Sequence, residues 1–239
     1  MRIFAISDLH LPAREKPMDV FGPHWENHFE RISASWREKV AAEDVVLLPG
    51  DLTWAMRLED AMEDLRRVGD LPGRKIILRG NHDYWWSGVG QVRRALPEGM
   101  FALQNDAMEL DGVLFAGSRG WTLPGQDATR EDEKIYLRER IRLEMSLKAA
   151  RRLSEEKPLY VMMHYPPFSP SCEGYSDLIR AYGAQMCVYG HLHGGGLSLA
   201  FNGEKDGVVY RQVSCDGLGF RVRSILPDEE TEESGTLLP

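Results

Sequence analysis

Five groups of Asp, Asn and His residues follow five short apolar runs along this chain, and this recurrence constrains the fold more than any other feature. Each run is rich in Ile, Val, Leu, Phe, Tyr or Met, which is typical of a buried strand. The groups that follow the runs are Asp8-Leu9-His10, Gly50-Asp51, Gly80-Asn81-His82-Asp83, His164 and Gly190-His191-Leu192-His193. In open α/β sheets, binding sites gather outside the carboxyl ends of the strands. We therefore expect the five groups to meet at one edge of an α/β fold.

The residue types in these groups are those of metal ligands. The candidate ligands are Asp8, His10, Asp51, Asn81, His164, His191 and His193. Side chains at positions i and i+2 of an extended segment point the same way, which would pair Asp8 with His10 and His191 with His193. Mixed imidazole and carboxylate ligands suit zinc, manganese or iron, whereas calcium and magnesium favour oxygen alone. Seven ligands are too many for one tetrahedral ion and fit two ions about 3.5–4 Å apart that share a carboxylate, an arrangement used for phosphoryl displacement.

The ordered set of five motifs resembles the calcineurin-like metallophosphoesterase superfamily, over residues 8–193. The resemblance implies that one metal is held by Asp8, His10 and His193, and the other by Asn81, His164 and His191. It implies that Asp51 bridges the two ions, that His82 lies beside the substrate and that Asp83 orients it. It also implies a fold of two stacked mixed β-sheets flanked by helices, a four-layer αββα sandwich. A hydroxide bridging the ions would attack phosphorus in line with the departing oxygen.

His82 is the imidazole left over from the ligand set, and its chemistry suits a general acid. The departing oxygen is a poor leaving group unless it is protonated, and a histidine with an ordinary pKa near 6.5 can supply that proton. His82 is adjacent to the ligand Asn81, so its side chain should point elsewhere and remain free for substrate. A single histidine is usually a surface residue or a polar residue whose hydrogen bonds are satisfied within the fold. The five histidines in the motifs all follow predicted strands, which argues against this explanation for them.

The residues that would bind substrate are constrained less well. The candidates are Asn81, Arg119 and His24. His24 and Trp25 lie in the loop after the first motif, where they either line the substrate cleft or are solvated. Arg119 follows another apolar run and could hold phosphate in a bidentate manner, with an ordinary surface position about equally favoured. Trp85 and Trp86 follow the third motif, which contains His82. They are either packing residues or an aromatic wall for the leaving group, and packing is favoured for at least one.

Helical and strand patterns alternate along the chain, as expected of layered α/β folds. Apolar spacing predicts helices over residues 26–42 and 58–68, and a long helix that starts at Thr129 and ends before Pro158. This long helix is expected to flank a sheet rather than to form a separate cap. Strands are predicted over Val113–Ala116 and, after Gly196, over Leu197–Ala200, Val208–Val213 and Gly219–Val222. Residues 1–227 should form one domain, and residues 228–239 an acidic tail.

The bulk composition limits the functional classes. The formal net charge of −8 argues against a nucleic-acid binder, which would present a basic face, although two divalent cations would still attract a phosphorylated substrate. The three cysteines form no Cys-x-x-Cys pair, which favours free thiols in a reducing compartment. No signal peptide or membrane-length apolar run is present, so a cytoplasmic location is expected. The oligomeric state is not predicted.

The sequence predicts an enzyme, a metal-dependent phosphoric ester hydrolase with two divalent ions, manganese favoured over iron or zinc, acting on a small phosphomonoester or phosphodiester. The alternative substrate is a nucleotide or a pyrophosphate-linked metabolite. A non-catalytic scaffold is disfavoured by retention of all seven ligands and His82, and a nuclease by charge and size. The protein Ser/Thr phosphatases carry Gly-Asp-x-x-Asp-Arg-Gly, whereas this chain continues from Asp51 as Leu52-Thr53-Trp54-Ala55. That branch is therefore excluded from the expectation.

Overall fold

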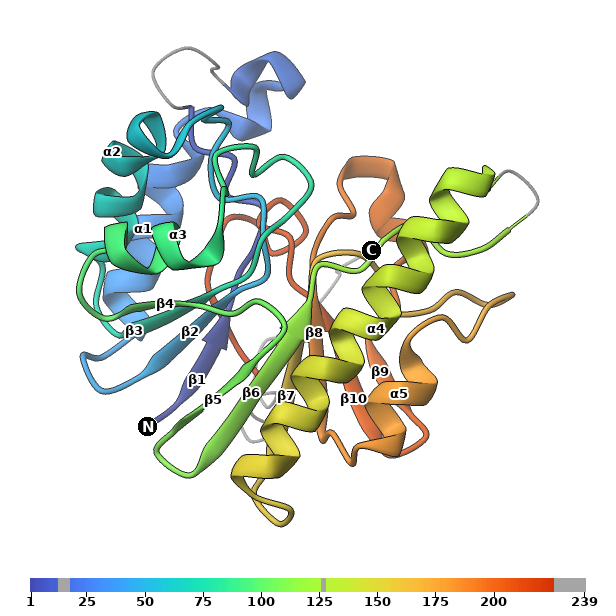
Figure 1. Ribbon diagram of the computed structural model, residues 1–239. Helices are drawn as coiled ribbons and strands as arrows, with labels where there is room; N and C mark the ends of the chain where they lie inside the picture. Colours follow the sequence, from blue (N-terminus) through green and yellow to red (C-terminus); the bar gives the residue numbers. More distant parts are fainter. Residues whose placement is uncertain (13–17, 126–127, 226–239) are drawn as a thin grey trace, which may run out of the picture.

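The computed structural model describes residues 1–12, 18–125 and 128–225, and these form two stacked β-sheets with helices outside both (Figure 1). The five-stranded sheet has the order β11-β1-β2-β3-β4, with β1 (Ile3–Ala5), β2 (Val45–Leu48), β3 (Arg74–Ile77), β4 (Met100–Ala102) and β11 (Arg223–Ser224). The six-stranded sheet has the order β5-β6-β7-β8-β10-β9, with β5 (Ala107–Leu110), β6 (Val113–Ser118), β7 (Leu159–Met163), β8 (Met186–Tyr189), β9 (Gly203–Lys205) and β10 (Val208–Gln212). Only the pairs made by β11, β5 and β9 are antiparallel among the described strands, so both sheets are mixed.

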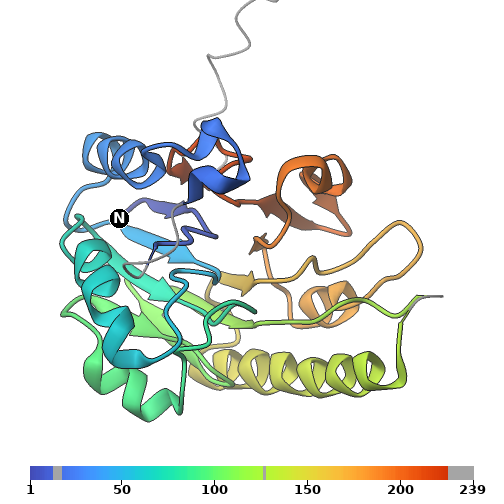
Figure 2. The ribbon, with the colours of Figure 1, turned by 90° about the horizontal axis from the view of Figure 1, so that it is seen from above.

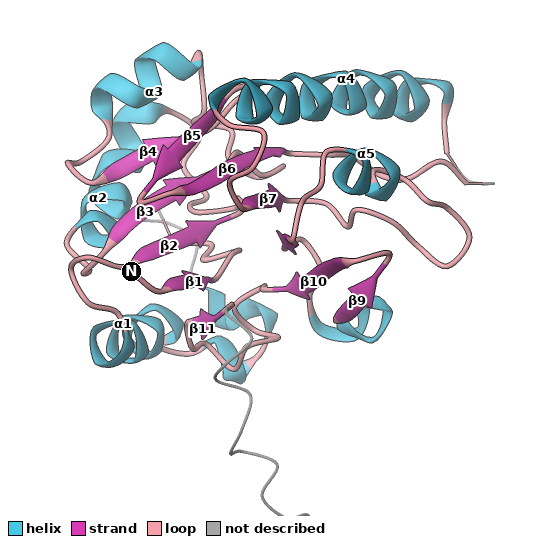
Figure 3. Cartoon of the chain, turned by 90° about the horizontal axis from the view of Figure 1, so that it is seen from below, coloured by secondary structure: helices cyan, strands magenta, loops and turns pink. Residues whose placement is uncertain are grey.

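Helices cover the outer face of each sheet, as Figures 2 and 3 show. Those outside the five-stranded sheet are α1 (His28–Lys39), α2 (Leu58–Gly69) and α3 (Val89–Ala95). Those outside the six-stranded sheet are α4 (Arg130–Leu153) and α5 (Ser176–Ala181). Three short 3-10 helices are also described: η1 (Met18–Phe21), η2 (Pro23–Trp25) and η3 (Gly194–Leu199). The four-layer αββα sandwich is thus confirmed. None of the described helices has the length and apolar character that crossing a bilayer requires.

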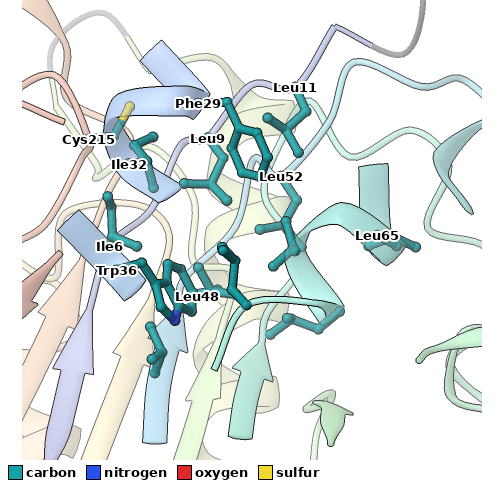
Figure 4. Close-up of a cluster of buried hydrophobic side chains, with 14 of the residues drawn as sticks. Ile6, Leu9, Leu11, Phe29, Ile32, Trp36, Leu48, Leu52, Leu65 and Cys215 are labelled. Atoms are coloured by element: carbon teal, nitrogen blue, oxygen red, sulfur yellow. The ribbon is translucent and has the colours of Figure 1, made fainter. Parts of the chain in front are cut away.

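The strands of the five-stranded sheet alternate their side chains between two cores. Phe4 and Leu48 pack with the helices on the outer face, whereas Ile3 and Val45 face the second sheet. Figure 4 shows the outer core, in which Trp36 of α1 lies against the sheet. Because parallel strands buried on both faces carry apolar residues at successive positions, they appear in the sequence as continuous apolar runs. This burial explains why the runs before the five motifs were recognisable.

Helix α4 begins and packs as predicted. The Thr129 hydroxyl accepts a hydrogen bond from the Asp132 N–H (3.1 Å), and the Asp132 carboxylate accepts one from the Thr129 N–H (3.1 Å), which forms a capping box. Tyr136, Leu143 and Leu147 are buried in the core shared with the six-stranded sheet. Helix α4 therefore flanks that sheet. The unit β2-α2-β3 is likewise the parallel crossover expected between the second and third motifs.

The chain after Gly196 differs from the prediction. The strand predicted over Leu197–Ala200 is wrong, because residues 194–199 form the 3-10 helix η3. None of the residues of η3 is buried, and Leu199 is 79% exposed, so this segment has no apolar face packed in a sheet. The strand predicted over Gly219–Val222 is also wrong, because Phe220 has a left-handed backbone (φ 61°) that a strand does not accommodate. A hairpin does form between β9 and β10. The acidic tail over residues 228–239 lies outside the described residues.

Candidate metal centre

The five motifs converge where strands of both sheets end. The candidate ligands that follow β1, β2, β3, β7 and β8 are Asp8, Asp51, Asn81, His164 and His191. Backbone hydrogen bonds join their turns, since the Asp8 N–H donates to the Gly50 carbonyl (3.0 Å) and the Gly190 N–H donates to the His164 carbonyl (3.1 Å). The ligands therefore come from both sheets and meet at one edge of the sandwich.

Four of the candidate ligands have a left-handed backbone. These are Asp8 (φ 59°), His10 (φ 44°), Asp51 (φ 54°) and His191 (φ 71°). This conformation is uncommon for a residue with a β-carbon, and such strain gathers at functional sites. The expectation that Asp8 and His10 share a side because the segment is extended is therefore wrong. Tight turns, rather than extended backbone, bring the two side chains together.

Asp8, His10 and His193 form a first group of ligand atoms, all within 4.8 Å of one another. The Nε2 atoms of His10 and His193 are 3.3 Å apart. Asp8 Oδ1 lies 3.3 Å from His193 Nε2 and 4.0 Å from His10 Nε2. Asp8 and His10 are buried, and the His193 side chain is 31% exposed. This group can hold one metal ion.

A second group consists of Asp8, Asp51 and His164. Asp51 Oδ2 lies 3.4 Å from His164 Nε2 and 3.9 Å from His10 Nε2, so this carboxylate lies beside an imidazole of each group. Asn81 Oδ1 lies 2.6 Å from His164 Nε2 and 3.0 Å from His191 Nδ1. All seven predicted ligands are thus brought together, in two adjoining groups.

Gly80 allows the third motif to approach the second. A β-carbon at Gly80 would lie 2.0 Å from Asp51 Oδ1 and 2.4 Å from the Asp51 nitrogen, distances that no side chain can occupy. The Asp51 Oδ1 atom also accepts a hydrogen bond from the His82 N–H (2.8 Å). The glycine of the motif is therefore required by the close contact between the two turns.

Two of the imidazoles are oriented by contacts at their second nitrogen. His193 Nδ1 lies 2.9 Å from Asp216 Oδ1, and the other Asp216 oxygen accepts a hydrogen bond from the Gly194 N–H (2.9 Å). His164 Nδ1 lies 3.0 Å from the Pro49 carbonyl oxygen. Such partners fix the tautomer and the ring orientation of metal-binding histidines. Asp216 was not identified from the sequence, although it follows β10, which is parallel to β8 and ends at the same edge.

The charges of the site suit a divalent cation. Burial lowers the pKa of His10 to about 3 and the pKa values of His164 and His191 to about 4, so these rings are neutral and keep a lone pair for a metal. His193 differs, because contacts with Asp216 and Asp8 outweigh burial and raise its pKa to about 10. Burial alone would raise the pKa of Asp8, but its contact with the protonated His193 holds it well below its usual range. A cation between Asp8 and His193 would take the place of that proton.

Asp83 ties two ligand turns together. Its Oδ2 accepts hydrogen bonds from the Asp51 N–H (2.8 Å) and the Gly80 N–H (2.7 Å). Its Oδ1 accepts hydrogen bonds from the Leu52 N–H (2.9 Å) and from Trp85 Nε1 (2.9 Å). These contacts give the buried Asp83 carboxylate a positioning role for the turns. The orienting role implied for Asp83 beside His82 stays a prediction.

His82 lines a pocket of about 300 Å³ beside the first ligand group, which we call the aromatic pocket. Its lining includes His10, His24, Trp25, Trp54, His82, His193 and Asp216. The His82 ring centroid is 4.5 Å from that of Trp54 and 5.7 Å from that of His10. His24 and Trp25 thus line a pocket beside the first ligand group, whereas contact between His24 and a substrate stays a prediction. Trp54, which stacks on His10 at 4.8 Å, was missed because nothing in its motif distinguishes it from a packing residue.

The two tryptophans that follow the third motif do not line this pocket. Trp85 and Trp86 are 1% and 2% exposed, and Trp86 Nε1 donates a hydrogen bond to Gln104 Oε1 (2.8 Å). The packing interpretation is therefore confirmed for both, and the aromatic-wall interpretation is wrong, because both indole nitrogens are satisfied inside the fold.

Arg119 also lies outside the aromatic pocket. Its guanidinium stacks over Trp121 at 4.7 Å and lies 3.6 Å from the Glu139 carboxylate. It lines a separate pocket of about 280 Å³ that includes Arg79 and Arg142. The backbone of Arg119 is nevertheless close to the metal centre, because its carbonyl accepts a hydrogen bond from the His164 N–H (3.2 Å). Contact between Arg119 and a phosphate stays a prediction.

Comparison with known proteins agrees with this geometry. A family model for calcineurin-like phosphoesterases matches residues 1–195, a range that contains all seven candidate ligands. No curated protein matches the chain significantly. The solved structure of a protein of unknown function from Aquifex aeolicus is similar, with 18% sequence identity, coverage of 93% of this chain and 95% of that chain, and a TM-score of 0.49. The family match spans most of the sequence, so this chain belongs to the calcineurin-like phosphoesterase family.

Proposed function

We propose that this protein is a dinuclear metal-dependent phosphoesterase that hydrolyses a small phosphomonoester or phosphodiester. The observation that carries the proposal is the position of the Asp51 carboxylate, whose Oδ2 lies 3.9 Å from His10 Nε2 and 3.4 Å from His164 Nε2. A carboxylate between two sets of imidazoles suits a pair of ions better than a single ion. Asp8, His10 and His193 would hold one ion, and Asn81, His164 and His191 would hold the other.

The donor set favours a transition metal in both positions. Imidazole and carboxylate ligands together suit manganese, iron or zinc, and we propose manganese. When bound, such ions make water nucleophilic at neutral pH and neutralise the oxygens of the phosphoryl group. The neutral state of His10, His164 and His191 leaves their ring nitrogens available for this role.

In this proposal His82 acts as the general acid. Its ring lines the aromatic pocket beside His10, so a leaving group in that pocket would receive its proton from His82. Trp25 and Trp54 would contact the organic part of the leaving group. Asn81 would contact the phosphate besides binding metal. Arg119 would contact only a substrate that extends into its own pocket.

The second candidate is a nucleotide or pyrophosphate-linked metabolite. It is favoured by the two tryptophan rings in the aromatic pocket, since indole faces stack well on nucleobases. A nucleotide leaving group would place its base against Trp25 or Trp54, with the scissile phosphate at the ligand groups. The pocket volume of about 300 Å³ is at the small end of the range for ligand sites.

The test is an activity screen of protein reconstituted with manganese, zinc or iron. Phosphomonoesters, phosphodiesters and dinucleotides would be offered at matched concentration, with Asp8→Asn as the control that removes the charge of a carboxylate shared by both groups. Metal-dependent release of phosphate or alcohol that is lost in Asp8→Asn is the expected result. A protein that binds two ions and hydrolyses none of the three classes would contradict the proposal.

A further inference from the structure

A second and larger space opens beside the other ligand group. It is a groove of about 900 Å³, which we call the apolar groove, and its lining includes Leu123, Phe168, Leu192, Leu199 and Phe201. The candidate ligand His191 also lines it, as does Tyr165, whose ring centroid is 4.0 Å from that of His191. The apolar groove therefore reaches the metal centre itself.

The last ligand turn divides this groove from the aromatic pocket. His191 and Leu192 line the groove, whereas the next two residues, His193 and Gly194, line the aromatic pocket. The two spaces have no lining residue in common among the described residues. The metal centre is thus open to two separate spaces, one at each ligand group.

Two spaces suit a phosphorus centre that carries two organic groups. A phosphomonoester has one such group and a phosphodiester has two. The leaving oxygen departs in line with the attacking one, so the ester group that stays on phosphorus must extend in another direction. His82 lines the aromatic pocket, which places the leaving group there and leaves the groove for the group that stays.

We propose that the apolar groove binds the non-leaving arm of a phosphodiester and that this arm is apolar, an inference that rests on the proposed function. Water would replace the leaving oxygen on phosphorus, and His82 would supply the proton that the leaving oxygen takes. The product left in the groove is then a phosphomonoester that carries the apolar arm.

The lining determines the chemistry of the arm. Leu199 is 79% exposed and Phe201 is 37% exposed, so apolar surface is available to be covered by a ligand. Lys205, the one Lys or Arg among the described residues of the lining, lies 2.8 Å from the Asp206 carboxylate and 5.2 Å from the Phe168 ring, so its charge is already compensated. An alkyl or aryl arm therefore fits the groove better than an anionic one. The volume falls within the range of sites that enclose drug-sized ligands.

The test measures binding rather than turnover. The probes are n-alkyl(methyl)phosphinates with methyl, butyl and octyl chains, which carry the single charge of a phosphodiester but have no P–O ester bond to break. Their dissociation constants would be measured by calorimetry on protein loaded with two equivalents of manganese. Each methylene that is fully buried should tighten binding about fourfold, so affinity should rise steeply with chain length.

Four variants show where the alkyl chain of the probe binds. Leu199→Ser should flatten the dependence on chain length, and Leu199→Met should restore it. Leu137→Ser, the same change at another exposed leucine (58%) on α4, should leave it steep. If the unmodified protein binds dimethylphosphinate but its affinity does not rise with alkyl chain length, the groove proposal is overturned and the phosphoesterase proposal stands. Phe21 lines the aromatic pocket. If Phe21→Ser flattens the dependence of affinity on alkyl chain length and Leu199→Ser does not, the groove proposal is also overturned. If no phosphinate binds the loaded protein, the groove proposal fails, and the activity screen on phosphomonoesters decides the phosphoesterase proposal.

Discussion

The Nδ1 atom of His193 lies 2.9 Å from Oδ1 of Asp216, a residue that belongs to none of the five ligand motifs. This contact directs the Nε2 atom of His193 toward Asp8 and His10. It also contributes to the raised pKa of His193, because the imidazolium is stabilised between two carboxylates. Asp216 is therefore a positioning residue for the first ligand group.

We predict that Asp216→Asn weakens metal binding about 10- to 100-fold, the usual cost of losing such an outer partner. The asparagine keeps the shape of the side chain but removes the charge that stabilises the ring. Competition titration against a chromophoric chelator measures the change. Asp206→Asn, which alters an exposed carboxylate in the β9–β10 turn, is the matched control. Equal affinities of the Asp216 variant and the unmodified protein would remove the positioning role.

His82→Ala should retain the metals and the fold while lowering turnover by roughly 10²–10⁴, the scale of general acid–base help. The loss should be smaller for nitrophenyl esters, because nitrophenolate needs little protonation to leave. Turnover of alkyl and nitrophenyl esters, measured together with metal content, provides the comparison. An equal loss for both ester types would instead indicate that His82 positions the phosphate.

Lys75 gives a prediction about stability that does not involve the metals. Its side chain is 2% exposed, its ammonium donates a hydrogen bond to the Gly69 carbonyl (2.8 Å), and burial lowers its pKa to about 8. Between pH 8 and about 10.5 the unfolded chain keeps a proton on this lysine that the folded chain has lost, so the contribution of Lys75 to stability rises with pH. Below pH 8 both states are protonated and the cost of the buried charge is fully present.

Urea unfolding of metal-free protein at pH 7.5 and pH 10 checks this prediction, with Lys75→Met as the comparison. Other groups titrate alike in both proteins, so the difference between their unfolding free energies isolates Lys75. That difference should shift in favour of the unmodified protein by up to about 3 kcal/mol at the higher pH. An unchanged difference would show that the lysine is hydrated in the folded state.

The convergence of the candidate ligands could be predicted because the sequence pattern of a buried parallel strand is local. Strands such as β2 and β7 are buried on both faces, so they appear as apolar runs, and a polar residue directly after such a run must lie at the sheet edge. The positions of Asp51, His164 and His191 behind their strands therefore predicted that these residues meet at one sheet edge, whereas the sandwich of two stacked sheets was implied by the family resemblance. The start of α4 was equally local, because a capping box needs only Thr129 and Asp132.

What was missed depends on contacts between distant segments. Asp216 carries no motif, and its role arises because β10 lies beside β8 in the sheet. The short apolar stretch Leu197–Ala200 matched a strand, but residues 194–199 form the 3-10 helix η3 instead. Composition and spacing carry no information about such partners.

The proposed sharing of the Asp51 carboxylate by two ions can be tested by the metal content of the purified protein. Elemental analysis of protein purified without chelator should give about two transition-metal ions per chain, as a dinuclear site requires. In Asp51→Asn the occupancy should fall at both positions, because Oδ2 of Asp51 lies beside an imidazole of each ligand group. A stoichiometry near one in the unmodified protein, or a variant that loses one ion and keeps the other at full occupancy, would contradict the account.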